Sequence, residues 1–192
     1  MVPALAYLIE TLTNLYLLVF LLRFLLQVAR ADFYNPISRF VVRVTDPVVV
    51  PARRIIPTWR GLDLPTMVVL IVLQTIVTVL LLALANLRVP IDQLIWLVVF
   101  RLVSMTIWMY TICVLVHVIL SWISQAGYNP VAMLLHQIVE PILRPARRII
   151  PPIGGLDFSP LITLILLQAI SIALATSIAP LVVAPVLVGL IR

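Results

Sequence analysis

The sequence has little charge, one cysteine, few glycines and no lysine. Charged residues make up 10% of the 192 residues, whereas soluble domains usually carry about a quarter. The single cysteine, Cys113, excludes an intramolecular disulfide, and the five glycines form no phosphate-binding loop. The histidines and acidic residues form neither a nucleophile–base set nor a zinc-ligand spacing. We therefore expect no enzyme, and no catalytic, cofactor-binding or metal-binding residues.

Hydrophobic residues, in contrast, make up 64% of the chain. They fall in blocks of about twenty residues, the length that an α-helix needs to cross a bilayer. The blocks predict an all-α membrane protein with four transmembrane helices, at about 4–28, 65–87, 100–124 and 160–180. The net charge of +6 lies beside these blocks without interleaved aromatic residues, so it favours anionic lipid headgroups and not nucleic acid as a partner.

A seven-residue string that begins at Pro51 and ends at Pro57 recurs unchanged 94 positions later, from Pro145 to Pro151. The chain is therefore an internal repeat of two units, residues 1–94 and 95–192. Each unit contains two spans and the segment that joins them. The two units are expected to form parallel-repeat helical hairpins, related by an axis along the membrane normal.

The segments that join the spans predict two short amphipathic helices, at about 37–50 and 131–143. Apolar residues recur in them at helical spacing, which is typical of a helix in the membrane interface; the second is more apolar and is either interfacial or re-entrant. Asparagine followed by proline is a helix start signal. It occurs twice, as Asn35-Pro36 and Asn129-Pro130.

Each repeated string holds two arginines between two prolines, and the prolines are expected to keep the backbone out of a regular helix. The arginines are Arg53, Arg54, Arg147 and Arg148. Three interpretations remain open: a topology marker, binding of anionic lipid, and docking of a protein partner. Asp63 and Asp157, or Asp46 and Glu140, could instead pair with the arginines inside the fold.

Polar residues inside the spans need a physical reason, because hydrocarbon offers them no hydrogen bonds. Gln74 and Gln168 occupy equivalent positions in the second and fourth spans, so we expect an interhelical polar pair between them. Arg23, near the end of the first span, is expected to extend its side chain to the headgroups.

Arginine is concentrated in the two segments that join the spans, and this asymmetry predicts orientation. Nine of the 13 basic residues lie there: Arg30, Arg39, Arg43, Arg53, Arg54, Arg60, Arg144, Arg147 and Arg148. Because cytoplasmic loops carry the excess of basic residues, both segments are expected in the cytoplasm and both termini in the periplasm.

The motifs resemble the YggT repeat. They are an Asn-Pro pair, an acidic-Pro step, Pro-Ala-Arg-Arg-Ile-Ile-Pro and a Gly-Leu-Asp before the next span, all present in both halves. The resemblance implies a multi-pass protein of the bacterial inner membrane in the YggT/YlmG family. That family has been linked to osmotic-stress tolerance, to division and to membrane-complex assembly, without an agreed biochemical activity.

Two functions follow as expectations. The first is a non-enzymatic scaffold or assembly factor in envelope processes, which acts through its arginine-rich loops on lipid headgroups, a membrane protein partner or a second copy of itself. The alternative is a small oligomeric channel or transporter that contributes to osmotic tolerance, which would need a polar path through the spans.

Overall fold

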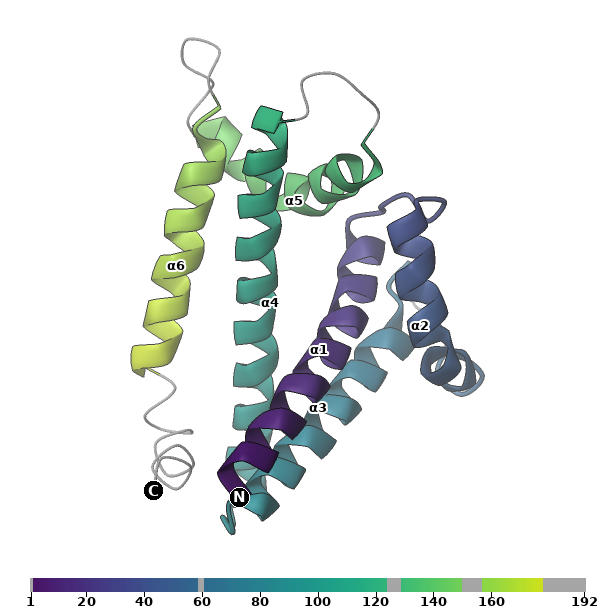
Figure 1. Ribbon diagram of the computed structural model, residues 1–192, viewed down its shortest axis with the longest axis vertical. Helices are drawn as coiled ribbons and strands as arrows, with labels where there is room; N and C mark the ends of the chain where they lie inside the picture. Colours follow the sequence, from purple (N-terminus) through teal and green to yellow (C-terminus); the bar gives the residue numbers. More distant parts are fainter. Residues whose placement is uncertain (1, 59–60, 124–128, 150–156, 178–192) are drawn as a thin grey trace.

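The computed structural model describes residues 2–58, 61–123, 129–149 and 157–177. The regular elements in these ranges are six helices (Figure 1). Their bounds are α1 Val2–Val28, α2 Pro36–Arg53, α3 Leu64–Leu84, α4 Ile91–Ile123, α5 Pro130–Ile149 and α6 Ser159–Ser177.

The helices α1, α3, α4 and α6 are long and apolar enough to cross a membrane. They run alternately up and down, and α2 and α5 both lie at one end of the bundle (Figure 1). The start of α1, the α3–α4 connection and the end of α6 lie toward the opposite end. The fold is therefore an all-helical bundle of four long apolar helices. Two shorter helices lie at one end of it.

Two apolar clusters hold the helices together. The first joins α1 to α3 and α2, and includes Phe20, Leu70 and Val49. The second lies between α4 and α5, and also takes in Leu26 of α1 and Val41 of α2. Because the second cluster contains residues from both halves of the chain, the two repeats share one packed interior at the end that holds α2 and α5.

The helix α6 is the least buried of the long helices. Its contacts are with α4 and α5, and the most apolar window of α6 is 11% buried, against 39% for α3. Large apolar side chains such as Leu161, Ile165 and Ile172 remain exposed. In a membrane these side chains face hydrocarbon, which solvates leucine and isoleucine as well as another helix would.

The expected break in the helices at the repeated string is wrong. Pro51 lies inside α2 and Pro145 inside α5, so the arginine pairs belong to the ends of these two helices and not to a rigid loop. Pro57 follows α2 as non-helical chain, and Pro151 lies outside the described residues.

The helix α2 tolerates its prolines because they share one face. Pro47 and Pro51 are one turn apart and both exposed. The hydrogen bonds that proline cannot make are therefore lost on the outer side of the helix, and the buried side stays intact. The axis of α2 changes direction along its length in Figure 1, the usual effect of proline inside a helix.

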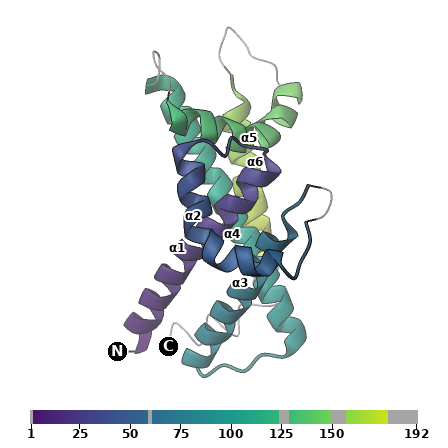
Figure 2. The ribbon, with the colours of Figure 1, turned by 90° about the vertical axis from the view of Figure 1, so that its right-hand side faces the viewer.

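Both short helices have a buried face. Ser38, Val41, Thr45 and Val49 recur every three or four residues and form the buried face of α2. The corresponding face of α5 contains Leu134, Ile138, Val139, Leu143 and Ala146. Figure 2 shows α5 across the upper part of the molecule and α2 below it, in front of the long helices.

Candidate functional site: two ion-pair clusters at one end of the bundle

The two short helices begin at capping asparagines. The Asn35 side-chain oxygen accepts a hydrogen bond from the Ile37 backbone N–H at 3.0 Å, and Asn129 accepts one from Val131 at 2.9 Å. These bonds satisfy N–H groups that have no partner within the helix. The Asn35 amide also donates to the Pro130 carbonyl oxygen at 2.7 Å. This contact ties the start of α2 to the start of α5.

Arg53 and Asp63 form the first ion pair. Arg53 Nη2 donates to Asp63 Oδ2 at 2.6 Å, and the Thr66 hydroxyl donates to the same oxygen at 2.7 Å. Burial raises the pKa of the Asp63 carboxyl, but the hydrogen bonds from Arg53 and Thr66 outweigh burial, and the net pKa lies below its ordinary value. Asp63 is therefore a buried carboxylate that fastens the end of α2 to the start of α3.

Arg23 joins the same cluster from α1. Its Nη1 donates to Asp46 Oδ1 at 2.8 Å and also to the Thr45 hydroxyl, and its Nε lies 3.9 Å from Asp63 Oδ2. Arg23 is 3% exposed, so the expectation that it reaches toward the headgroups is wrong. The reason is that α2 and the start of α3 bring two carboxylates within its reach, which satisfies the guanidinium inside the protein.

The second repeat builds a similar cluster around one arginine. Arg147 Nη1 donates to Glu140 Oε2 at 2.6 Å, and Arg147 Nε donates to Asp157 Oδ2 at 2.9 Å. Burial raises the pKa of Asp157, but hydrogen bonds from Ser159 and Arg147 hold its net pKa below the ordinary value. The same carboxylates raise the pKa of Arg147 against the opposite effect of burial. Arg147 thus bridges two acids, whereas Arg53 and Arg23 share two acids in the first repeat.

The repeats differ at the position of Arg23. The residue 94 positions later is His117, on α4. Its ring centroid lies 5.6 Å from that of His136 on α5. The first cluster therefore contains a permanently charged side chain where the second has an imidazole, a difference that the repeated strings themselves do not reveal.

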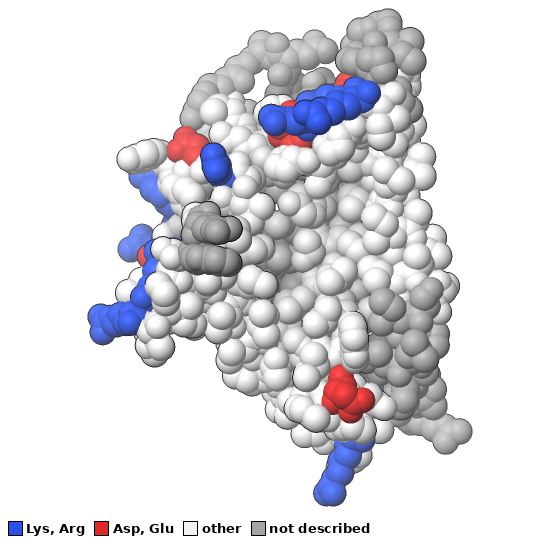
Figure 3. Space-filling view, turned by 180° about the vertical axis from the view of Figure 1, so that it is seen from behind, with Lys and Arg blue, Asp and Glu red and all other residues white. Residues whose placement is uncertain are grey.

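The second arginine of each pair points away from these clusters. Arg54 and Arg148 are exposed, and within the described ranges neither forms an ion pair. We call Arg54 and Arg148 the outward arginines. In Figure 3 most of the visible basic side chains lie on the half of the molecule that holds α2 and α5. The repeated string thus combines one arginine that binds acids within the protein with one that is available at the surface.

The structure does not bring Gln74 and Gln168 together. Gln74 on α3 is fully buried and donates to the Thr78 hydroxyl on the same helix at 3.3 Å. Gln168 is exposed on α6, which packs against α4 and α5. The equivalent positions face different surroundings because α3 is enclosed by α1, α2 and α4, while the matching side of α6 has no such neighbours among the described helices.

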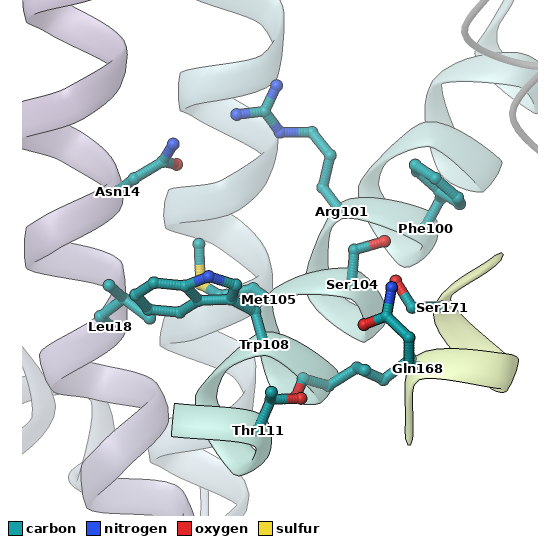
Figure 4. A pocket seen from close by; sticks show the side chains of 11 residues that line it. Asn14, Leu18, Phe100, Arg101, Ser104, Met105, Trp108, Thr111, Gln168 and Ser171 are labelled. Carbon is teal, nitrogen blue, oxygen red and sulfur yellow. The ribbon is translucent and has the colours of Figure 1, made fainter. Parts of the chain in front are cut away.

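A second feature lies within the long helices and was not predicted from the sequence. Arg101 of α4 donates to Glu10 of α1 at 3.1 Å. Beside this pair a pocket of about 540 Å³ is lined by α1, α4 and α6, with Asn14 and Gln168 on opposite sides (Figure 4). The signal available in the sequence was the presence of two opposite charges in different spans, but helix order alone does not show which spans touch.

Comparison with known proteins gives a family match and several relatives that align over most of this chain. The family model described as CCB3/YggT matches residues 2–84 and 96–178, once in each half. The chain is 40% identical over 172 residues to a protein of Escherichia coli K12 described as the uncharacterized protein YggT, covering 89% of each chain. An uncharacterized protein of Pseudomonas aeruginosa is 40% identical over 176 residues, covering 90% of this chain and 89% of the relative.

A further relative, from Vibrio alginolyticus and also described as uncharacterized, is 42% identical over 180 residues and covers 92% of this chain and 96% of its own. No solved structure matches the chain. The family match spans both halves, and the relatives align over nearly their whole length. The chain belongs to the CCB3/YggT family.

Proposed function

We propose that this protein is a non-enzymatic scaffold or assembly factor of the bacterial inner membrane, and that its outward arginines form the contact surface. The proposed setting is an envelope process such as osmotic-stress tolerance, division or assembly of a membrane complex. In this proposal α2 and α5 lie on the cytoplasmic side and both chain termini in the periplasm, because arginine is concentrated on and around α2 and α5.

One observation carries the proposal: both repeats neutralise the first arginine of the pair and leave the second exposed. Arg53 and Arg147 bind carboxylates within the protein, whereas Arg54 and Arg148 form no ion pair with any residue that the structure describes. A guanidinium at a helix end near the membrane surface suits the phosphate of an anionic headgroup or the carboxylates of a protein partner. Two such groups, one at the end of each short helix, would give a bivalent contact.

The experiment places a photo-crosslinking amino acid at position 54 or 148 in the full chain, in cells. A specific cross-linked band at both positions is expected, and Arg54→Glu with Arg148→Glu should weaken co-purification of the cross-linked species. The matched control is position 88, because Arg88 is also exposed but belongs to the α3–α4 connection, which lies at the opposite end of the bundle (Figure 1). Equal cross-linking at 54, 148 and 88 would contradict the proposal.

Lipid and protein contacts can be separated with purified protein. In vesicles with and without phosphatidylglycerol or cardiolipin, the charge-reversed variant should lose its preference for anionic lipid if headgroups are the ligand. An unchanged lipid preference together with a lost protein cross-link would identify a membrane protein partner or a second copy as the contact.

A second candidate function, an oligomeric channel or transporter, is favoured by the polar side chains in the pocket between α1, α4 and α6. Polar groups inside the spans are expensive and often mark a solute path. Solute flux into liposomes that contain the pure protein tests this function, and flux equal to that of empty liposomes would contradict it.

A further inference from the structure

We propose that the pocket between α1, α4 and α6 is a binding site for a small uncharged molecule that carries several hydroxyl or amide groups. The pocket volume of about 540 Å³ lies within the range of small-molecule sites, about 300–1,000 Å³. The helix α4 lies between α1 and α6 (Figure 1), so side chains of three different helices converge on the pocket.

Four uncharged polar side chains line the pocket without a hydrogen bond to any described residue: Asn14, Ser104, Gln168 and Ser171. The Asn14 side-chain oxygen is buried and has no protein partner in the described ranges. By contrast, the Thr111 hydroxyl, also in the lining, donates to the Ile107 carbonyl oxygen of its own helix at 2.9 Å.

A buried polar group without a partner in an apolar medium is unfavourable until it finds a hydrogen bond. The Asn14 oxygen is in this position, while Ser104 and Ser171 are half-buried and Gln168 is exposed. A ligand that supplies donors and acceptors together would satisfy Asn14 and could bond the other three. Figure 4 shows that Ser104, Gln168 and Ser171 lie close together on the α4–α6 side of the pocket, with Asn14 across from them on α1.

The depth of the pocket argues against a lipid headgroup as the ligand. Gln168 is near the middle of α6, which runs from Ser159 to Ser177. At 1.5 Å per residue it lies about 14 Å from the start of the helix, close to half of a hydrocarbon core of about 30 Å. Headgroup phosphates lie outside this core, whereas a small solute can occupy a pocket within it.

The charges at the pocket argue for an uncharged ligand. Arg101 is the cation of the lining, and Glu10 neutralises it at 3.1 Å. The remaining lining includes apolar groups such as Leu18, Met105 and Trp108, which carry no formal charge. The site therefore offers hydrogen bonds and apolar contact without net charge.

Binding at this pocket does not depend on the outward arginines, and it does not require transport. A static binding site would give ligand binding without flux, so failure of the channel candidate leaves the binding proposal intact. Loss of partner cross-linking at position 54 would likewise leave it intact.

The test uses the full chain in lipid nanodiscs, with erythritol as the probe and saturation-transfer difference NMR as the measurement. We expect a saturable signal from erythritol and a weaker or absent signal from glycerol 3-phosphate, which has a similar size but carries charge. Asn14→Leu combined with Gln168→Leu should weaken the apparent affinity at least about tenfold, since each lost hydrogen bond contributes about 1 kcal/mol and 1.4 kcal/mol is tenfold.

The matched control is Thr176→Val, on α6 but outside the pocket lining, which should bind as the unaltered chain does. Ser104→Ala with Ser171→Ala provides a second, smaller change if the leucine variant does not fold. A signal that does not saturate, that persists in both pocket variants, or that is equal for glycerol 3-phosphate overturns the proposal. A second copy of the chain that fills the pocket and excludes erythritol would overturn the proposal as well. Such a copy would be detected as a disulfide between copies of Ser104→Cys in a Cys113→Ala background.

Discussion

Arg53 and Asp63 form a salt bridge of 2.6 Å in which the acid is 1% exposed and the arginine side chain 45% exposed. The bridge joins the end of α2 to the residue before α3. In the second repeat Arg147 and Asp157 make the same connection at 2.9 Å. The first arginine of the repeated string is therefore a structural residue in both halves, whereas the second is exposed and forms no ion pair with the described residues.

These different contacts predict different effects on stability when Arg53 and Arg54 are replaced. Arg53→Ala leaves the buried Asp63 carboxylate without its main partner, so we expect a loss of about 1.5–3 kcal/mol in the free energy of unfolding. Arg54→Ala removes an exposed side chain and should change stability by no more than about 0.5 kcal/mol. Thermal unfolding in detergent, followed by circular dichroism, measures both; equal destabilisation by the two variants would contradict the assignment.

Arg23 should matter more for stability than any exposed arginine. Arg23→Gln removes the cation that holds Asp46 and lies beside Asp63. Removal of one partner from a fully buried ion pair costs about 3–5 kcal/mol, and the loss here should be smaller because Asp46 is 41% exposed. Arg23→Lys keeps the charge but not the planar set of donors, so the loss in the free energy of unfolding should be intermediate for this variant. Arg39→Gln, an exposed arginine on α2, is the control; a similar loss in this variant would show that the buried network is not the cause.

The stability of the first cluster should depend on pH through Asp63. The pKa of Asp63 is lowered in the folded protein. Its contribution to the free energy of unfolding is therefore fully present above the unfolded pKa of about 3.9. The contribution is lost as the pH falls through the lower, folded pKa. The difference in melting temperature between the unaltered chain and Asp63→Asn should be constant between about pH 5 and pH 8 and should shrink below about pH 4. A difference that grows on acidification would reverse the sign and contradict the prediction.

Gln74 and Gln168 should be energetically independent, because the structure places them in separate surroundings. In a double-mutant cycle with Gln74→Leu and Gln168→Leu, the two changes should add to within about 0.5 kcal/mol. A coupling energy of about 1 kcal/mol or more would instead support the interhelical pair that the repeat suggests, formed within one chain or between copies.

The orientation can be tested with single cysteines in a Cys113→Ala background. Arg88→Cys, at the end of the bundle opposite α2 and α5, should react with a membrane-impermeant maleimide added to spheroplasts. Arg54→Cys should react only after the membrane is permeabilised, because the arginine-rich end is predicted to be cytoplasmic. The reverse labelling pattern would place both termini in the cytoplasm.

The repeated motifs show both what sequence can predict and where it fails. The asparagine caps of α2 and α5 are local signals, since the side chain bonds the backbone only two residues away. The prediction that Pro51 and Pro145 keep the backbone out of a regular helix was wrong because the effect of a proline depends on which face of the helix it occupies. That face is set by packing against the long helices.

By itself the sequence determined the membrane class, the four apolar helices and the twofold repeat, because hydrophobic length and repeated motifs can be read from the chain without its tertiary contacts. Only the tertiary structure decided which charges meet. Arg23 with Asp46, Glu10 with Arg101, and the separation of Gln74 from Gln168 all depend on which helices lie side by side. Equivalent positions in the second spans of the two repeats therefore differ in their surroundings, since α3 is more buried than α6.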